Sequence, residues 1–158
     1  MTNTHGGSRG IDNRNPFNVK QVPTKWKGSI GEDADGHAIF GHEVYSARAV
    51  MRDLADDFLN DDKRTLRGLF ADYAPKAAGN DPDDYARFVA KRIGRNPDEK
   101  LRLFRPNGAT NDFDSGLLLP ILMAMVEMEI CAGYQVPVEI LNSGMALYRR
   151  DFVSQVQP

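Results

Sequence analysis

The stretch from Leu117 to Gly133, LLLPILMAMVEMEICAG, is the most apolar run in the chain. A helix that is apolar on most sides is usually buried at the centre of a soluble domain, so we expect this stretch to form a core helix. It is too short and too acidic at its end for a membrane span, which needs about 20 apolar residues. The sequence therefore predicts a domain packed around residues 117–133.

Two carboxylates, Glu127 and Glu129, lie near the end of this stretch. At about 100° per residue, Glu129 falls in line with Leu122 and Met125, so its carboxyl would have apolar neighbours. Such surroundings disfavour the charged form of a carboxyl and raise its pKa, which makes Glu129 a candidate general acid. The alternative is that the last turn frays and both acids meet water, and helix geometry alone favours this alternative.

Length and composition indicate a single globular domain. The chain has 158 residues, of which 41% are hydrophobic and 27% charged, and these are ordinary proportions for one domain. We expect residues 11–150 to be globular, with a flexible polar arm over residues 1–10 and a C-terminal tail over residues 151–158. The formal net charge of −2 argues against a nucleic-acid partner, which would require a basic patch.

No metal or cofactor is predicted. The single cysteine, Cys131, excludes a disulfide framework and a thiolate cluster, and we expect it to be buried in the core helix. His5, His37 and His42 lack the spacing of metal ligands. The N-terminal residues contain no apolar segment of the kind found in secretory signals, so we expect synthesis in the bacterial cytoplasm.

Local signals predict the remaining elements. The Asp35–Gly36 step between apolar residues indicates a β-hairpin over about residues 26–40. Helical spacing and caps predict four further helices: over residues 43–59, between Thr65 and Pro75, between Asp81 and Gly94, and opening at Pro137. The predicted class is α+β and predominantly helical, with about five helices in all, packed around the apolar helix at residues 117–133, and a small N-terminal β-ribbon.

Some details of these helices are also predicted. Asp112 or Asp114 caps the central helix, and Pro120 in its first turn would place the start near Leu119. On the helix over residues 43–59, we expect Arg48 to lie on the solvated face.

Spaced motifs in the first two thirds of the chain resemble a family of small tailed-phage and prophage proteins that are usually assigned to the virion as structural proteins. The resemblance covers about residues 8–94. The matching residues are Arg9-Gly10-Ile11, Asn13, Asn15-Pro16, Asn18-Val19, Trp26, Gly28, Phe40, Glu43, Arg48-Ala49, Tyr73-Ala74-Pro75, Asp81, Tyr85, Val89-Ala90 and Ile93-Gly94.

The family also carries a C-terminal helix that ends in an H-E-N-G-like segment. Glu129 stands at the position of that glutamate, with Gly133 and Tyr134 following. The histidine and asparagine are absent, because this chain reads Met128-Glu129-Ile130-Cys131. Their absence favours a member of the family that has lost activity.

A second resemblance is to lysozyme-like glucosaminidases. There the catalytic glutamate ends a helix that precedes an N-x-x-x-[IV]-K segment, a β-ribbon and a further helix. Here the corresponding helix follows this pattern, which is the order of a circular permutant. The resemblance implies a lysozyme-like fold and a general-acid role for Glu129.

A glycoside hydrolase of this kind requires a second carboxylate within about 5–10 Å, whereas a mechanism like that of lytic transglycosylases requires only one acid. Glu43 is a candidate second carboxylate, and Glu32, Asp33 and Asp35 stay open. Candidates to line a sugar groove are Asn18, Trp26, Tyr45 and Tyr134, each of which is alternatively a core or turn residue.

Three functions follow as hypotheses. The first is a structural virion component of a tailed bacteriophage, in the tail or baseplate, with other virion proteins as partners. The second is a virion-borne enzyme that cleaves the β-1,4 links of peptidoglycan during entry. The third is a host-encoded adaptor of prophage origin without catalysis. All three predict no membrane and no nucleic-acid partner.

Overall fold

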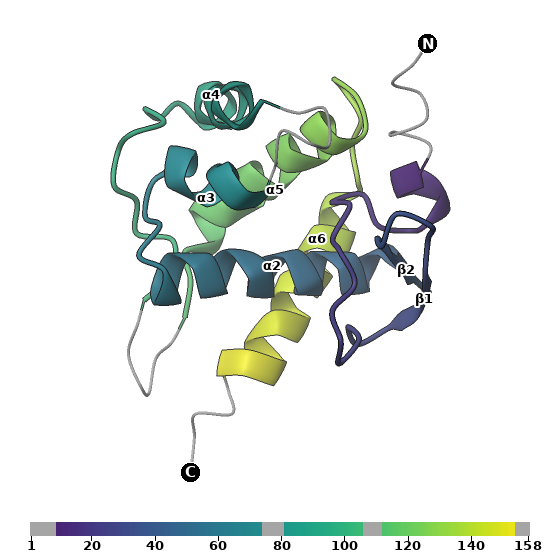
Figure 1. Ribbon diagram of the computed structural model, residues 1–158. Coiled ribbons are helices and arrows are strands. Elements are labelled where there is room, and N and C mark those ends of the chain that lie inside the picture. The colour runs from purple at the N-terminus through teal and green to yellow at the C-terminus, as the bar shows by residue number, and fades with distance from the viewer. Residues whose placement is uncertain (1–8, 74–80, 106–111, 154–158) are drawn as a thin grey trace.

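The computed structural model describes residues 9–73, 81–105 and 112–153 (Figure 1). The five predicted helices and the hairpin are confirmed in this part of the chain, whereas the lysozyme-like likeness stays a prediction. Residues 9–12 add a helical turn. The elements are β1 (Ser29–Glu32), β2 (Ala38–Phe40), α2 (Glu43–Asn60), α3 (Leu66–Tyr73), α4 (Pro82–Ile93), α5 (Ser115–Glu129), α6 (Val138–Tyr148) and the π-helix η2 (Arg149–Val153).

The β-hairpin is held by its turn as well as by its strands. β1 pairs antiparallel with β2, with Glu32 opposite Ala38. One oxygen of the Asp33 carboxylate accepts hydrogen bonds from the backbone N–H groups of Asp35 and His37, at 2.9 Å each. Gly36 has a φ of 88°, a left-handed conformation that glycine adopts without a steric cost.

Residues 9–19, called the N-terminal motif below, are hydrogen-bonded to the hairpin through Asn13 and Asn15. Asn15 is fully buried, and its Nδ2 donates to the carbonyls of Val19 and Ala38 at 2.9 Å each. Its Oδ1 accepts from the backbone N–H of Val19 at 3.0 Å. The Phe40 N–H donates to the Asn13 carbonyl at 2.8 Å, so the motif is a local folding unit with most of its polar groups paired.

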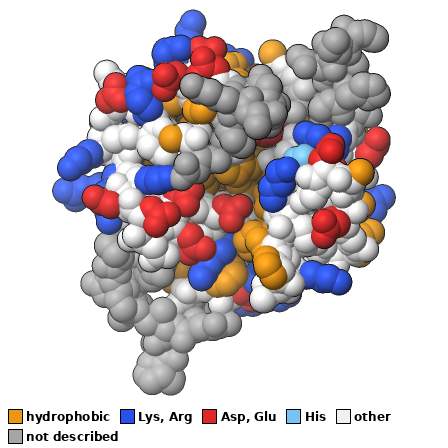
Figure 2. Space-filling model, in the orientation of Figure 1, with side chains coloured by type: hydrophobic (Ala, Val, Ile, Leu, Met, Phe, Trp, Pro, Cys, Tyr) orange, Lys and Arg blue, Asp and Glu red, His pale blue; other side chains and the backbone are white. Residues whose placement is uncertain are grey.

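α2 crosses the middle of the molecule, and α6 crosses it at close range (Figure 1). A Cβ atom at Gly144 would lie 2.3 Å from the Cβ of Ala47, so only glycine allows these two helices to approach so closely. On the face seen in Figure 2, charged side chains surround a central hollow in which hydrophobic side chains gather.

The prediction that Arg48 is solvated is wrong. Its side chain is buried because η2 folds back over α2. Arg48 Nε donates to Asp151 Oδ2 at 2.7 Å, and its guanidinium lies 4.6 Å from the centre of the Phe152 ring. The first residues of the predicted C-terminal tail therefore pack on α2, and residues 154–158, like most of the predicted arm, lie outside the described residues.

α5 forms the core helix, but its limits differ from the prediction of residues 117–133. It begins at Ser115, because Asp114 caps it by accepting from the Leu117 N–H at 3.2 Å. Pro120 therefore lies inside the helix rather than in its first turn, at the cost of one intrahelical hydrogen bond. The helix ends at Glu129, which leaves Cys131 exposed beyond it rather than buried.

The apolar side chains of α5 pack into the core of the domain. Its buried residues include Leu118, Ile121, Leu122 and Met125. Within the described ranges, no helix combines the length and the apolarity that crossing a bilayer requires.

Asn15→Ala tests the folding role of the N-terminal motif. The substitution leaves two carbonyls and one N–H without their buried partner, so we expect the free energy of unfolding to fall by about 2 to 4 kcal/mol. Urea denaturation followed by circular dichroism measures this loss. Asn142→Ala, at an exposed position of α6, is the matched control and should change stability by less than about 0.5 kcal/mol. Equal effects of the two substitutions would contradict the role given to Asn15.

Candidate functional site

The Glu129 carboxylate, at the last residue of α5, is held by two side chains from distant parts of the chain. Asn18 Nδ2 donates to Oε1 at 2.9 Å, and the Tyr85 hydroxyl donates to Oε2 at 2.9 Å. The alternative in which both acids meet water is therefore wrong for Glu129. The residue as a whole keeps part of its surface exposed, whereas its carboxyl is largely buried.

Burial governs the protonation of this carboxyl. It raises the pKa of Glu129 above its ordinary value. The hydrogen bonds from Asn18 and Tyr85 and the nearby positive charge of Arg9 act in the opposite direction but do not outweigh burial. Glu129 is thus biased toward the protonated form, in which a carboxyl can donate a proton.

Glu127 has the opposite setting, although it lies only two residues away. Arg92 binds its carboxylate through two nitrogens, at 2.8 and 3.0 Å, and the backbone N–H of Gly133 donates to it at 2.9 Å. These contacts lower the pKa of Glu127. Its carboxylate is therefore held ionised in a surface ion pair, and the two acids of α5 have different roles.

The partners of Glu129 are themselves fixed in place. Asn18 has a φ of 51°, in the left-handed region that asparagine tolerates better than most residues. The ring of Tyr85 is fully buried on α4 and lies 4.6 Å, centre to centre, from the ring of Phe70. Tyr73 donates to the carbonyl of Phe17 at 2.5 Å, which ties α3 to the segment that carries Asn18.

Two buried polar atoms beside Glu129 have no hydrogen-bond partner among the described residues: Nε of Arg9, a donor, and Oδ1 of Asn18, an acceptor. Gly10 lies between these residues in sequence, and a Cβ atom there would come within 3.4 Å of Asn18 Oδ1 and 2.4 Å of Ile130 Cδ1. Buried polar atoms are normally paired, so these two atoms are exceptions in the surroundings of Glu129.

Two other candidate site residues, Glu43 and Tyr134, meet at a separate pocket whose lining does not include Glu129. Trp26 donates through Nε1 to the carbonyl of Lys20 at 2.8 Å. The Tyr45 ring packs on Gly28, where a Cβ atom would lie 2.1 Å from it. The structure thus places Asn18 in contact with Glu129. That Trp26, Tyr45 and Tyr134 bind a sugar stays a prediction.

The remaining candidates for the second carboxylate lie on the hairpin. Glu32 is exposed on β1. Asp33 is occupied by the hydrogen bonds of the turn and by Asn13 Nδ2, which donates to it at 3.0 Å. Asp35 lies 3.4 Å from Arg9 Nη1, so Arg9 links it to the surroundings of Glu129.

Asp53 on α2 is an unusual acid that sequence analysis did not identify. Burial, together with the negative charges of Asp57 and Asp56, raises the pKa of Asp53 to about 7. Asp53 and Glu129 also both raise the pKa of the buried Tyr73 hydroxyl. The run DLADD at residues 53–57 carries a signal, because residues four apart share one face of a helix, but the burial behind it depends on the fold.

In the part of the chain that the structure describes, no three acidic, histidine or cysteine side chains converge as metal ligands would.

Comparison with known proteins places the chain near a bacteriophage protein. It is 30% identical over 104 residues to Protein P5 of Pseudoalteromonas phage PM2, a match that covers 63% of this chain and 64% of that protein. The match therefore spans slightly less than two thirds of that relative. No protein-family model matches the chain. The predicted link to bacteriophage proteins is supported by this similarity, at the level of a phage-related protein.

Asp53→Asn tests the raised pKa of Asp53. Between about pH 4 and 7 the folded carboxyl keeps a proton that the unfolded chain has lost, so the stability of the wild type should fall as pH rises. The substitution should remove part of this fall and raise the free energy of unfolding at pH 7.5 by about 1 to 3 kcal/mol, with little effect at pH 4.

Urea denaturation at pH 4, 6 and 7.5 measures this difference between Asp53→Asn and the wild type. Asp84→Asn, at an exposed position on α4, is the control and should follow the wild-type pH dependence. Because burial raises the pKa of Glu129 as well, some pH dependence should persist in Asp53→Asn. A curve for Asp53→Asn that parallels the wild type would contradict the assignment.

Proposed function

We propose that this chain is a virion-associated protein of a bacteriophage. The similarity to Protein P5 of Pseudoalteromonas phage PM2 supports the phage origin. The motif resemblance over residues 8–94 to phage virion proteins supports a place in the particle. Other virion proteins are the partners that this proposal implies.

Particle purification tests this proposal. Particles are purified on a density gradient from cells that produce the phage encoding the chain, and the fractions are probed with an antibody against it. We expect the chain to sediment with infectious particles and to survive washing in high salt. Recovery of the chain only in the soluble fraction of the lysate would rule out a virion location.

A second function, cleavage of the glycan strand of peptidoglycan, is favoured by the setting of Glu129. A carboxyl whose pKa is raised by burial is what a general acid for glycoside cleavage requires, and Asn18 and Tyr85 hold this one in place. A structural acid would gain more from a charged partner, as Glu127 gains from Arg92. This contrast within one helix is the observation that carries the proposal.

The reaction follows from these contacts. Protonated Glu129 gives its proton to the glycosidic oxygen while the bond from that oxygen to the sugar C1 breaks, and the electron pair leaves with the oxygen. Water or the sugar's own 6-hydroxyl then bonds to C1 and returns a proton to Glu129. Asn18 and Tyr85 stabilise the carboxylate formed between the two steps, since both donate to it.

In this proposal no second carboxylate is needed if the sugar's own hydroxyl attacks C1. If water attacks, Glu43 and the hairpin acids are the candidates to activate it.

Glu129→Gln tests the general-acid role in a turbidity assay on purified peptidoglycan. The wild type should clear the suspension, and Glu129→Gln should be slower by about 100-fold or more, because the amide cannot give up a proton. Clearing by the wild type should also fall as pH rises through the raised pKa of Glu129. Circular dichroism checks that both proteins are folded.

Glu127→Gln is the matched control. It changes an acid two residues away on the same helix, and it should clear peptidoglycan at the wild-type rate. Loss of activity in both variants would point to damage at the end of α5 rather than to a general acid. If the wild type does not clear the suspension at all, Glu129 is a structural contact only, and the virion proposal stands unaffected.

A further inference from the structure

A small pocket lies apart from the Glu129 carboxyl, where three segments distant in sequence meet. It is lined by the helical turn at residues 9–12 and by Pro16, by the first residue of α2, and by the connection from α5 into α6. The lining residues are Gly10, Ile11, Pro16, Glu43, Tyr134, Val136, Pro137 and Ile140.

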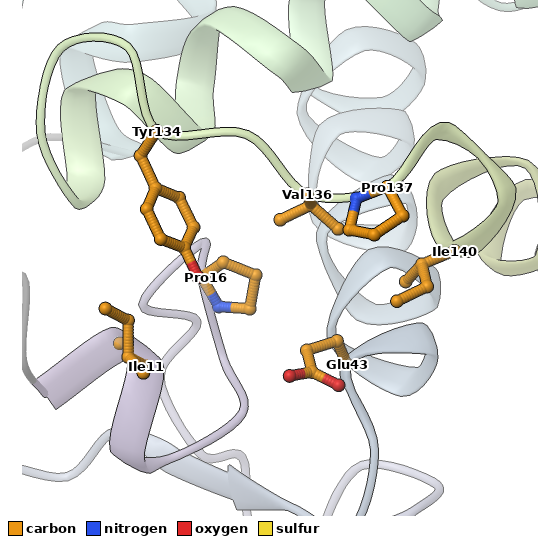
Figure 3. Close-up of a pocket in the computed structure, with 8 residues that line it drawn as sticks. Ile11, Pro16, Glu43, Tyr134, Val136, Pro137 and Ile140 are labelled. Atoms are coloured by element: carbon orange, nitrogen blue, oxygen red, sulfur yellow. The ribbon is translucent and has the colours of Figure 1, made fainter.

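The side chains of this pocket form an apolar cup with one charged group. Figure 3 shows the Tyr134 ring reaching toward Pro16 on one side and Val136 and Ile140 on the other, with Glu43 at the lower edge of the pocket. Apart from Glu43 and the Tyr134 hydroxyl, the lining side chains are hydrocarbon. A ligand for this pocket therefore needs an apolar body and a cationic end.

The Glu43 carboxylate is available to such a cation. No Lys or Arg nitrogen of the described residues lies within 4.0 Å of it, and its nearest basic neighbour is Nδ1 of His42 at 3.9 Å. That nitrogen accepts a hydrogen bond from the backbone N–H of Val44 at 3.0 Å, as the cap of α2. Nδ1 of His42 is therefore engaged by the cap of α2.

The size of the pocket selects a side chain rather than a larger molecule. Its cavity volume is about 40 Å³, far below the range of about 300–1,000 Å³ of most small-molecule sites. A lysine side chain has a narrow aliphatic stem and a compact ammonium with three donors. Its stem would lie along the proline, valine and isoleucine side chains and its ammonium would reach Glu43.

We propose that this pocket binds the side chain of a lysine from a partner protein, with Glu43 as the counter-ion and Ile11, Val136 and Ile140 around the stem. Ile11 supports an intermolecular contact, because it is one of the large hydrophobic residues left exposed, at 48%. A buried stem and a paired charge together resemble the anchor residues of protein interfaces. The inference does not depend on the chemistry of Glu129.

Methyl NMR on the full chain tests this inference. The probe is Nα-acetyl-lysine N-methylamide, and the matched compound is the norleucine analogue, which has the same stem without the ammonium. We expect saturable shifts of the Ile11, Val136 and Ile140 methyl signals with the lysine probe, and at least tenfold weaker binding of the norleucine analogue. Glu43→Gln should likewise weaken binding of the lysine probe at least tenfold.

Glu139→Gln is the control variant, since Glu139 is an exposed acid in the first turn of α6 outside the pocket lining. It should bind the lysine probe as the wild type does. Equal binding of the two compounds, no shifts with the lysine probe, or unchanged binding by Glu43→Gln would each overturn the inference. Tighter binding of a diaminopimelate-containing muropeptide at the same methyl groups would assign the pocket to the cell wall instead.

Discussion

The hydrogen bonds from Asn18 and Tyr85 to Glu129 hold three distant segments of the chain together. It joins the end of α5 to the N-terminal motif, 111 residues away, and to α4, 44 residues away. A carboxyl in such surroundings is costly unless its oxygens are paired, so the positions of all three segments are constrained together. Two local features accompany this contact: the left-handed backbone of Asn18 and the lack of space for a side chain at Gly10.

The N-terminal motif that contacts Glu129 is in turn hydrogen-bonded to the hairpin. Asn15 fixes the chain on either side of Asn18 by pairing with Val19 and Ala38. The close approach of α6 to α2 at Gly144 brings η2 over Arg48. The small pocket near Glu43 lies where the N-terminal motif, α2 and the connection before α6 come together without filling the space between them.

Elements that rest on local signals could be predicted from the sequence. The hairpin follows from the Asp35–Gly36 step, and α4 lies between the cap at Asp81 and the left-handed Gly94. For α5, Asp114 was one of the two caps predicted, but the start near Leu119 was wrong, because the helix continues through Pro120 despite the hydrogen bond that proline removes. The burial of Arg48 and the exposure of Cys131 depend on which distant segment covers them, and no local pattern carries that information.

The candidate site divides in the same way. The position of Glu129 at the end of an apolar helix was visible in the sequence, but no pattern in the sequence linked it to its partner Tyr85. The meeting of Glu43 with Tyr134 was likewise hidden, because each lies in a different part of the chain.

The separation of Asn18 and Glu129 also sets an order of events during synthesis. Ribosomes add about 5 to 20 residues per second, so roughly 5 to 20 s pass between the appearance of Asn18 and that of Glu129. During this interval the N-terminal motif and the hairpin can form, but the Glu129 carboxyl, which completes the cluster with Asn18 and Tyr85, has not yet been synthesised. A nascent chain therefore carries the hydrogen-bond donors Asn18 and Tyr85 without their acceptor until its translation has passed α5.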